Sequence, residues 1–486
     1  MSSLKILFAS SEVAPFAKTG GLADVSGSLP AALASLGHQV VVVMPLYRSV
    51  KEGDYNIKKN DKFLTIPSKG QNLKAGIYST TMSGDIPIYF IQREEFFDRS
   101  GLYGTPDGDY FDNPERFIFY SRSIVELSQM IGFQPDILHC HDWQTSLVPV
   151  YLKSRFKTAL PLKKIRSVFT IHNLAYQGIF PKEMMSFTEL PLELFSIRGL
   201  EYYGKMNFMK GGIVFSDMIT TVSAKYAQEI QTPEYGYGMD GVLRGRQADL
   251  FGILNGVDYT LWNPGTDPHI ASTYDEKDIS GKKNCKDELR MAYGLKGPDE
   301  FPVIGMISRL ADQKGFDILA EAMDQLLKFD LCLVILGTGD AKYEKQFAAL
   351  AKKHPGRLGV KIAFDNALAH KIEAGSDMFL MPSKYEPCGL NQMYSLKYGT
   401  VPIVRATGGL DDTIKEFNPD TGKGTGFKFN AYSSTELVKA VKRAAYLYKN
   451  KLLWTKIVKN AMNQDFSWQK SAHEYEEVYR KALTKV

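Results

Sequence analysis

Cysteine is scarce in this sequence. Four cysteines, Cys140, Cys285, Cys332 and Cys388, occur among 486 residues, and no two of them form a C-x-x-C pair. We therefore expect free thiols in a reducing compartment and no disulfide framework.

Long apolar runs are also missing. The longest, Val40–Met44, is far shorter than the roughly 18 residues that a membrane span needs. Near the amino terminus, the apolar stretch Ile6–Ala9 meets Glu12 too soon to form the core of an export signal. These absences predict a cytoplasmic protein that does not use a membrane as a partner.

Neither sign of charge dominates. Lys and Arg number 59 against 54 Asp and Glu, and the resulting net charge of +5 is spread along the chain rather than gathered in a tail. Nothing in this balance indicates nucleic acid as a partner. The composition, 44% hydrophobic and 12% aromatic, is that of a globular protein, and the length suits two large α/β domains.

Three common active-site signatures are absent. Gly337-Thr338-Gly339 lacks the third glycine of G-x-G-x-x-G because Lys342 stands there, which disfavours a nicotinamide enzyme. No G-x-x-x-x-G-K-[ST] surrounds the Gly-Lys pairs at 281–282 and 422–423, and no G-x-S-x-G elbow occurs. The sequence thus excludes the usual P-loop and serine-hydrolase motifs.

Strand and helix patterns alternate along the whole chain. Lys5–Ser10, Leu29–Leu36 and Gln39–Met44 predict a strand, a helix and a second buried strand. In the second half, helical spacing at Ile318–Phe329 and Lys342–Lys353 separates short apolar strands. Those strands are expected at Val303–Ser308, Leu331–Leu336, Val360–Ala363, Met378–Met381 and Val401–Val404. The alternation predicts an α/β protein with a doubly wound, mostly parallel sheet in each half.

A short motif occurs once in each half. Thr19–Asp24 reads TGGLAD and Thr407–Asp412 reads TGGLDD, each where a loop should enter a helix and offer backbone N–H groups to an anion. The turn-rich segment from Asn255 to Gly265 follows a strand expected at Phe251–Leu254 and marks the best boundary. We expect a domain at 1–256 and a second at 257–465, with a cleft between them.

His139-Cys140-His141-Asp142 ends another apolar run. Two histidines on one face of a strand sometimes bind a metal, but no third ligand motif follows. The favoured interpretation is a polar strand end that faces the cleft. The acidic turn Asp107-Gly108-Asp109 is interpreted as a turn rather than a cation site. We predict no metal.

Seven motifs carry a resemblance to a known family. They are Lys18–Val25 (KTGGLADV), His139–Trp143 (HCHDW), Thr170–Gly178 (TIHNLAYQG), Asn255–Asp258 (NGVD), Ser308–Gly315 (SRLADQKG), Glu386–Leu390 (EPCGL) and Thr407–Leu410 (TGGL). In this order and over nearly the whole length, the chain resembles glycogen and bacterial or plastid starch synthases.

The resemblance implies a GT-B-type fold with two Rossmann-like domains. The first would be the acceptor side, joined by a carboxyl-terminal helix over 466–486, and the second would bind the nucleotide sugar. The implied reaction is transfer of glucose from ADP-glucose to the non-reducing 4-hydroxyl of an α-1,4-glucan, with retention of configuration and without metal or other cofactor. The residues alone do not distinguish ADP from UDP, and the oligomeric state stays open.

The chemistry of the motifs agrees with such a reaction. A leaving diphosphate needs fixed positive charge, which Arg309 and Lys314 supply after the strand Val303–Ser308. By resemblance, Glu386 holds the glucosyl unit and stabilises the positive charge of an oxocarbenium-like state. Tyr394 stands where the wider superfamily often has a second glutamate, so a two-glutamate mechanism is not expected.

Three further candidates follow strand ends. His172 and Asn173 come after the apolar segment Val168–Ile171, and the resemblance places the histidine at the anomeric centre and the asparagine near a sugar hydroxyl. A histidine held by a backbone partner is the structural alternative. Phe364 resembles the residue that stacks on the nucleobase, with core packing as its alternative.

The remaining candidates come from the resemblance. Cys388 is expected to pack while its backbone N–H serves the sugar, and an activated thiol is the alternative. The other substrate-binding candidates are Lys18, Gly20, Gly21, Asp24, Asn255, Gly389, Leu390, Thr407, Gly408 and Gly409. The acceptor-side candidates are Tyr103, Asp112, Asn113, Asp142 and Trp143, although a plain surface loop would look similar over Tyr103–Phe117.

Lys18 belongs to the first predicted domain, whereas Arg309, Lys314 and Glu386 belong to the second. We therefore expect the site to be complete only when the cleft closes and excludes water. A different retaining glycosyltransferase would need other acceptor motifs. A catalytically silent carbohydrate-binding relative would be expected to lack Arg309, Lys314 or Glu386, and all three are present.

Overall fold

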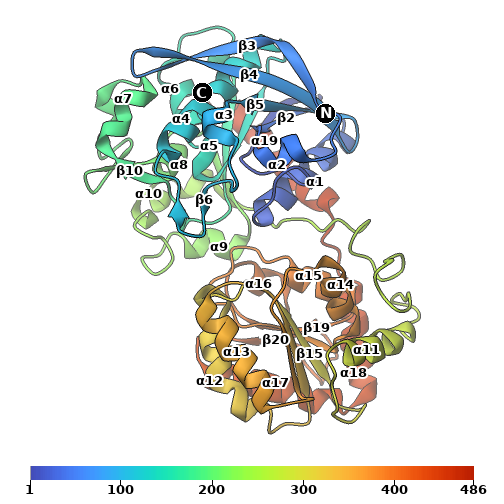
Figure 1. The fold of residues 1–486 in the computed structure, drawn as a ribbon. Coiled ribbons are helices and arrows are strands. Elements are labelled where there is room, and N and C mark those ends of the chain that lie inside the picture. Colours follow the sequence, from blue (N-terminus) through green and yellow to red (C-terminus); the bar gives the residue numbers. More distant parts are fainter. Residues whose placement is uncertain (1, 486) are drawn as a thin grey trace. The chain divides into compact units, whose positions relative to one another are not determined.

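The computed structural model describes residues 2–485, which divide into two compact units (Figure 1). Unit 1 comprises the described residues up to Val222, Ala227–Gly256 and the described residues from Trp468 onward. Unit 2 comprises Ser223–Tyr226 and Val257–Ser467. Each unit is built on its own sheet.

Unit 1 is built on a nine-stranded sheet. In order across the sheet, the strands are β14 (Leu250–Gly252), β13 (Met218–Thr221), β9 (Arg166–Ile171), β8 (Ile137–His141), β1 (Lys5–Ala9), β2 (Gln39–Pro45), β5 (Ile86–Gln92), β4 (Gln71–Met82) and β3 (Lys58–Ser68). The seven strands from β14 to β5 pair in parallel, and β4 and β3 extend the sheet as an antiparallel ribbon.

Helices and two small sheets complete unit 1. The helices are α1 (Gly21–Ser35), α2 (Arg48–Glu52), α3 (Glu94–Phe97), α4 (Asn113–Met130), α5 (Asp142–Thr145), α6 (Leu147–Lys153), α7 (Met185–Thr188), α8 (Phe208–Phe215), α10 (Asp240–Gly245) and α19 (Trp468–Thr484), while α9 (Ala224–Glu229) contains residues of both units. The small sheets pair β6 (Gly104–Thr105) with β7 (Gly108–Asp109), and β12 (Lys205–Asn207) with β10 (Ile179–Pro181) and β11 (Glu201–Tyr202). The 3-10 turns are η1 (Leu162–Lys164), η2 (Lys182–Met184), η3 (Leu192–Leu194) and η4 (Gln247–Asp249).

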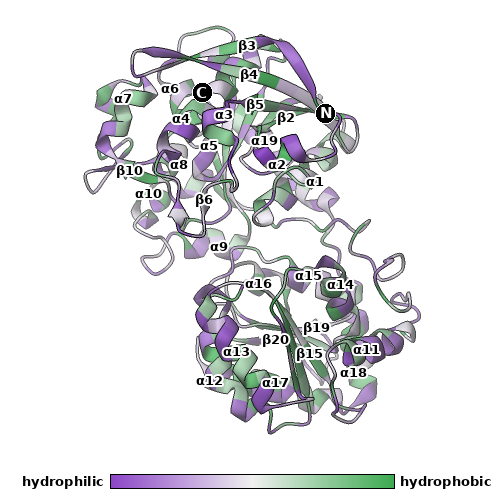
Figure 2. Cartoon of the chain, viewed as in Figure 1, coloured by the Kyte–Doolittle hydropathy of each residue, from purple (hydrophilic) through white to green (hydrophobic). Residues whose placement is uncertain are grey.

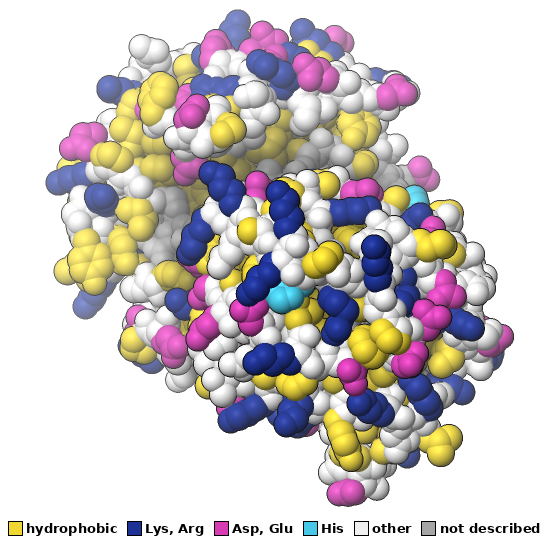
Figure 3. Space-filling model, turned by 60° about the horizontal axis from the view of Figure 1, so that its bottom comes forward, with side chains coloured by type: hydrophobic (Ala, Val, Ile, Leu, Met, Phe, Trp, Pro, Cys, Tyr) yellow, Lys and Arg dark blue, Asp and Glu magenta, His cyan; other side chains and the backbone are white. Residues whose placement is uncertain are grey.

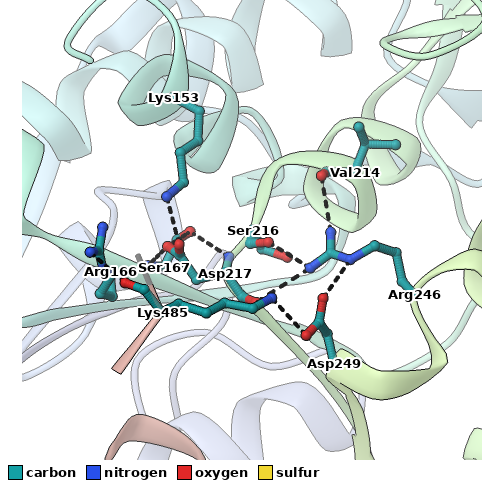
Figure 4. A network of polar contacts seen from close by, with 9 residues as sticks. All are labelled: Lys153, Arg166, Ser167, Val214, Ser216, Asp217, Arg246, Asp249 and Lys485. Carbon is teal, nitrogen blue, oxygen red and sulfur yellow. Dashed lines mark hydrogen bonds and ion pairs between the residues drawn. The ribbon is translucent and has the colours of Figure 1, made fainter. Parts of the chain in front are cut away.

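A polar network ties the end of the chain to the sheet of unit 1 (Figure 4). Lys485 Nζ lies 2.6 Å from the carbonyl oxygen of Asp217 and 2.6 Å from Asp249 Oδ1. The Asp217 carboxylate in turn accepts hydrogen bonds from the backbone and hydroxyl of Ser167 and pairs with Lys153. Because α19 also packs against α1, the last segment of the chain is an integral part of unit 1.

Unit 2 is built on six strands that all pair in parallel. Their order is β17 (Leu358–Lys361), β16 (Cys332–Leu336), β15 (Val303–Ile307), β18 (Met378–Met381), β19 (Val401–Arg405) and β20 (Phe427–Phe429). The helices are α11 (Gly281–Ala292), α12 (Phe316–Leu326), α13 (Ala341–Lys353), α14 (Asn366–Gly375), α15 (Asn391–Lys397), α16 (Gly408–Thr413), α17 (Ser434–Tyr448) and α18 (Lys451–Met462), with the 3-10 turn η5 (Asp312–Lys314).

The strands of unit 2 are apolar on both faces, and each face has its own core. Ile304 and Met306 of β15 pack in a core with α12 and α17, while Val303 of the same strand packs in a second core with α14 and α15. Figure 2 shows green strands in this unit between helices that carry both purple and green residues. Burial of each large aliphatic side chain stabilises such a sheet by about 1.5–3 kcal/mol.

The predicted fold class is confirmed: each unit is a Rossmann-like α/β domain. Two strand positions were misjudged. β17 spans Leu358–Lys361 rather than Val360–Ala363, because Leu358 and Gly359 pair with β16 whereas Ile362 is 38% exposed. β14 spans Leu250–Gly252 rather than Phe251–Leu254, since only those residues pair with β13. Within residues 2–485, none of the helices combines the length and the apolar character needed to cross a membrane.

Candidate active site

The sheet of unit 2 reverses its winding between β15 and β18. From β15 the chain adds β16 and β17 on one side, and it then returns to add β18, β19 and β20 on the other. Open α/β sheets bind ligands outside the carboxyl ends of the strands at this reversal point. Arg309 and Lys314 follow β15, and Glu386 follows β18, so three predicted catalytic residues lie on the two loops that flank the reversal.

Lys314 and Glu386 are in direct contact. Lys314 Nζ lies 2.6 Å from Glu386 Oε2, and Ser383 Oγ donates a hydrogen bond to the same oxygen over 3.0 Å. The Glu386 side chain is only 7% exposed, so its charge is stabilised by a cation and a hydroxyl rather than by bulk water. The ion pair therefore places an ammonium group and a carboxylate side by side at the reversal point.

A glycine allows the two loops to approach this closely. Gly315 has φ +78°, and a Cβ at this position would lie 2.2 Å from the carbonyl oxygen of Pro382. A side chain would therefore push the loop after β15 away from the loop after β18. Gly315 thus holds the adjacent Lys314 in reach of Glu386.

Arg309 also follows the carboxyl end of β15, but its side chain is exposed. Its guanidinium donates only a 3.3 Å hydrogen bond to Gln313 Oε1. Within the part of the chain that the structure describes, no carboxylate lies in ion-pair range of Arg309. The positive charge of Arg309 is therefore available to an incoming anion.

The TGGL segment packs against the loop that contains Glu386. Gly408 has φ +46°, and a Cβ there would lie 1.9 Å from the carbonyl oxygen of Glu386. The Gly409 N–H donates to the carbonyl oxygens of Glu386 and Pro387, each over 3.1 Å. The N–H of Gly409 is thus used within the protein, so of the N–H groups expected to face an anion at Thr407–Asp412, this one holds the Glu386 loop instead.

The other predicted residues of unit 2 differ in exposure. Phe364 is 90% exposed just after β17, which excludes core packing. Cys388 is buried, and the four cysteines form no disulfide among residues 2–485. Tyr394 stacks on Trp262 with ring centroids 4.0 Å apart, and His370 stacks on the other face of the same indole at 3.9 Å. The position of the second superfamily glutamate thus holds an aromatic stack.

The sheet of unit 1 has its reversal point between β1 and β8. The buried carboxylate of Glu12 follows β1, and its Oε2 accepts hydrogen bonds from the N–H groups of Thr19 at 2.6 Å and Gly20 at 3.3 Å. Its Oε1 accepts from the hydroxyls of Thr19 at 2.6 Å and Tyr103 at 2.8 Å. An anion therefore does lie at the start of the TGGLAD loop, but it belongs to the chain itself.

The exposed end of that loop carries an ion pair. Lys18 Nζ lies 2.6 Å from Asp24 Oδ1, with side-chain exposures of 49% and 31%. Exposed pairs of this kind contribute at most about 1 kcal/mol to folding. Lys18 can therefore exchange this partner for a substrate anion at little cost in stability.

His172 is held by two neighbours from the end of β8. Asp142 Oδ1 accepts a 2.7 Å hydrogen bond from the His172 N–H, and His172 Nε2 lies 2.9 Å from His141 Nδ1. Burial lowers the pKa of His172 to about 3, so the imidazole is neutral near pH 7. Burial raises the pKa of Asp142 to about 7, although backbone N–H groups favour its charged form.

His139 and His141 were predicted to form a polar strand end that faces the cleft, and their burial corrects this. Both side chains are fully buried. His139 Nδ1 lies 2.9 Å from the Tyr479 hydroxyl of α19, and His139 Nε2 lies 2.6 Å from Thr170 Oγ1. Burial lowers the pKa of both imidazoles, which makes them neutral supports of the sheet.

The predicted acceptor residues are held inside unit 1. Asp112 binds Arg99 with both oxygens at 2.5 and 2.6 Å, and Asn113 donates to the Tyr103 carbonyl oxygen over 2.9 Å. Arg116, which is fully buried, donates to Asn113 Oδ1 over 2.6 Å. These contacts form an ordered scaffold rather than a plain surface loop.

Trp143, another predicted acceptor residue, is only 8% exposed and packs against Phe117 with ring centroids 4.9 Å apart. It therefore lines the interior of unit 1 rather than an open rim. Asn255 is buried, and its Oδ1 has no hydrogen-bond partner within residues 2–485. No cluster of three metal-binding side chains occurs within the described part of the chain.

Comparison with known proteins identifies the family. Residues 5–245 match the model of the starch synthase catalytic domain, and residues 293–464 match that of glycosyl transferases group 1. A glycogen synthase of Koribacter versatilis is 50% identical over 479 residues, which cover 99% of this chain and 98% of that protein. A glycogen synthase of Thermotoga maritima is 47% identical over 489 residues, 99% of this chain and 100% of that protein.

The chain belongs to the glycogen and starch synthase family.

Solved structures agree with this assignment. The catalytic domain of starch synthase IV from Arabidopsis thaliana, bound to ADP and acarbose, matches this synthase with a TM-score of 0.91, 34% identity and complete coverage of both chains. Sucrose-phosphate synthase from Thermosynechococcus elongatus matches 98% of each chain at 15% identity with a TM-score of 0.59, and shows the shared fold alone. The synthase is therefore a glycosyltransferase with a GT-B fold.

Sequence reasoning missed several residues that hold the synthase site together. Glu12 and Ser383 lie outside the motifs and carry no spacing signal of their own. Only their partners reveal them: Ser383 Oγ and Lys314 share one oxygen of Glu386, and Glu12 binds Tyr103 across 91 positions of sequence. Ser383 had one available signal, since it lies between a predicted strand and Glu386.

Proposed function

We propose that this synthase transfers glucose from ADP-glucose to the non-reducing 4-hydroxyl of an α-1,4-glucan, with retention of configuration. The observation that carries the proposal is the Lys314–Glu386 pair at the reversal point of unit 2. The glycogen synthase names of the relatives and the ADP and acarbose in the starch synthase IV structure support the donor and the acceptor.

Positive charge on unit 2 would assist departure of the nucleoside diphosphate. Arg309 has no carboxylate partner among the described residues, and Lys314 can share its charge between Glu386 and a phosphate oxygen. At 4 Å and an effective dielectric constant of about 20, one such contact is worth about 4 kcal/mol before desolvation. Because these side chains supply the charge, we propose that the reaction needs no metal.

Glu386 would stabilise the opposite charge. As the glycosidic bond to the diphosphate breaks, positive charge develops at the anomeric carbon. A carboxylate held by Lys314 and Ser383 keeps a fixed position for this role. Gly389 and Leu390, and the backbone of Cys388, would bind the sugar from the same loop, and Thr407, Gly408 and Gly409 would support them.

Unit 1 would supply the acceptor side. We propose that His172 lies beside the anomeric carbon as a neutral imidazole, since its pKa of about 3 excludes an imidazolium near pH 7. Asn173 and Asn255 would bind sugar hydroxyls, and the loop with Lys18, Gly20, Gly21 and Asp24 would contact the substrates. Tyr103, Asp112, Asn113, Asp142 and Trp143 would set the shape of the acceptor surface through their internal contacts. Phe364 would stack on the nucleobase, because its ring is 90% exposed.

The experiment is incorporation of labelled glucose into glycogen from ADP-glucose and, separately, from UDP-glucose, each with and without EDTA. We expect incorporation from ADP-glucose that EDTA does not reduce. Incorporation from UDP-glucose alone would overturn the proposed donor, and loss of activity with EDTA would overturn metal independence. Glucan binding without incorporation from either donor would indicate a recognition protein instead.

A further inference from the structure

Unit 2 has a pocket beyond the amino ends of its strands. Glu386 lies beyond their carboxyl ends, on the opposite side of the unit. Helix α12 leads from the carboxyl end of β15 to the amino end of β16, so the turn after α12 lies beyond the amino ends. The pocket has a volume of about 670 Å³, within the range of small-molecule sites. It is lined by Lys328, Phe329, Asp330, Lys439, Lys442, Arg443, Ala445, Tyr446 and Lys449.

One wall is a single face of α17 and its end. The residues of this wall lie three or four positions apart along the helix, as in 439–442–446–449 and 439–443–446, which places them on one side: Lys439, Lys442, Arg443, Tyr446 and Lys449. The Tyr446 ring is 81% exposed. An exposed aromatic ring thus lies on a helix face that also carries four cations.

The opposite wall is the turn after α12. Arg357 donates to the carbonyl oxygen of Phe329 over 2.5 Å and to that of Leu331 over 2.7 Å, which fixes the turn. Lys449 Nζ lies 3.3 Å from Asp330 Oδ2 and links the two walls. Because α12 and α17 also share a buried core, the pocket is preformed by packed elements.

The lining carries an excess of positive charge. Lys439 pairs with Glu436 at 2.8 Å, Arg443 with Glu416 at 3.2 Å, and Lys449 with Asp330. In the described part of the chain, Lys328 and Lys442 have no carboxylate within ion-pair range. The face of unit 2 that is turned forward in Figure 3 shows dark blue Lys and Arg side chains together with yellow hydrophobic and magenta acidic ones.

We propose that this pocket binds an organic phosphate, namely a phosphate monoester carried on a ring. Lys328 and Lys442 bind the phosphate, which gives both lysines the counter-charge that the protein does not supply. The ring of the ligand lies on Tyr446 and Phe329. A neutral glucan would leave the two lysines without a counter-charge, and a bare phosphate would leave the Tyr446 ring uncovered.

The site is distinct from the proposed donor site. The residues that bind the diphosphate follow the carboxyl ends of the strands, whereas the pocket lies beyond their amino ends. Binding at the pocket therefore does not compete for Arg309 or Lys314. A ring-bearing phosphate monoester has two common sources, a sugar phosphate and a nucleoside monophosphate, and the probes below separate them.

The test is isothermal titration of the full-length protein with glucose 6-phosphate, adenosine 5′-monophosphate, inorganic phosphate and maltoheptaose. The pocket variants are Lys328→Ala/Lys442→Ala and Tyr446→Ala. The matched control is Lys345→Ala/Lys352→Ala, two exposed lysines of α13 that form no ion pair within residues 2–485. We expect one of the two organic phosphates to bind, and each pocket variant to weaken that binding at least tenfold while the control does not.

Four results would overturn the proposal. They are no binding of either organic phosphate, equally tight binding of inorganic phosphate, displacement of the organic phosphate by maltoheptaose, and undiminished binding in both pocket variants. If Lys314→Ala abolishes binding and the pocket variants do not, the ligand occupies the donor site and the proposal is wrong. Whichever organic phosphate binds identifies the ring that the pocket accepts.

Discussion

Lys314 Nζ lies 2.6 Å from Glu386 Oε2, so the loops after β15 and β18 are joined by an ion pair at the reversal point of the second sheet. The cation is suited to the departing diphosphate, and the carboxylate is suited to the developing oxocarbenium ion. Before the donor binds, each charge compensates the other. The same two side chains therefore contribute to the stability of unit 2 and to the proposed reaction.

The pair predicts a coupled effect on stability. Lys314→Met should lower the free energy of unfolding by about 3 kcal/mol, because it leaves the Glu386 carboxylate buried without its cation. Lys314→Met/Glu386→Gln should recover most of that loss and remain inactive. Urea denaturation of the wild type, both single variants and the double variant gives the coupling energy directly. A double variant no more stable than Lys314→Met would show that the loss in Lys314→Met does not come from an uncompensated Glu386 carboxylate.

Arg309 should matter for turnover and not for folding. Its guanidinium is exposed and makes one long hydrogen bond, so Arg309→Ala should leave the melting temperature nearly unchanged. The same change should lower kcat by about 10²–10³-fold, as expected for loss of one transition-state donor. Steady-state kinetics with ADP-glucose and glycogen measure this effect. A reduction of less than tenfold would remove Arg309 from the catalytic residues.

Gly408 should not tolerate a side chain. In Gly408→Ala the new Cβ would lie 1.9 Å from the Glu386 carbonyl oxygen, on a backbone with φ +46°. We expect a loss of about 2–4 kcal/mol in the free energy of unfolding, together with lower activity as the Glu386 loop shifts. Gly245→Ala is the control, since no atom lies within 4 Å of a Cβ placed there. Equal stability of the two variants in urea would refute this packing argument.

Asp142 should make stability depend on pH. Its pKa rises from an ordinary value of 3.8 to about 7 on folding, so between these values the folded state binds more protons than the unfolded state. The contribution of Asp142 is therefore fully present below about pH 4 and is lost as pH rises to about 7. The difference in unfolding free energy between wild type and Asp142→Asn should fall over this window and become constant above it.

The comparison with Asp142→Asn is needed because the buried histidines change the free energy of unfolding with pH in the opposite direction. The pKa of His172 falls from 6.5 to about 3 on folding, so its contribution increases as pH rises through that interval. Both proteins retain this histidine, and its contribution cancels in the difference. A difference that does not change between pH 4 and pH 7 would show that Asp142 ionises normally.

The sheets could be predicted from sequence because buried parallel strands are continuous apolar runs, such as Val40–Met44 in β2. The ends of strands were harder to predict. Ile362 and Ala363 continue an apolar run beyond β17, yet the pairing of β17 with β16 ends at Lys361. Pairing depends on the neighbouring strand, and the run itself does not contain that information.

The site was predictable where a motif carried it and not where tertiary contacts did. Lys314 and Glu386 lie in motifs, and the structure brings them together across 72 positions of sequence. His139 also lies in a motif, but Tyr479 covers it from 340 positions away, so its burial could not be foreseen. Glu12 gave no sequence signal because its partners, the Thr19 N–H and the Tyr103 hydroxyl, meet only in the folded unit.

The most direct test is the single-turnover rate of glucose transfer from ADP-glucose to maltoheptaose in wild type and Glu386→Gln. The Gln side chain keeps the shape and removes the charge, and Glu300→Gln, an exposed change in the same unit, serves as the control. We predict that Glu386→Gln slows transfer by about 10²-fold or more while Glu300→Gln does not. A rate within tenfold of wild type in Glu386→Gln would contradict the proposed role of the Lys314–Glu386 pair.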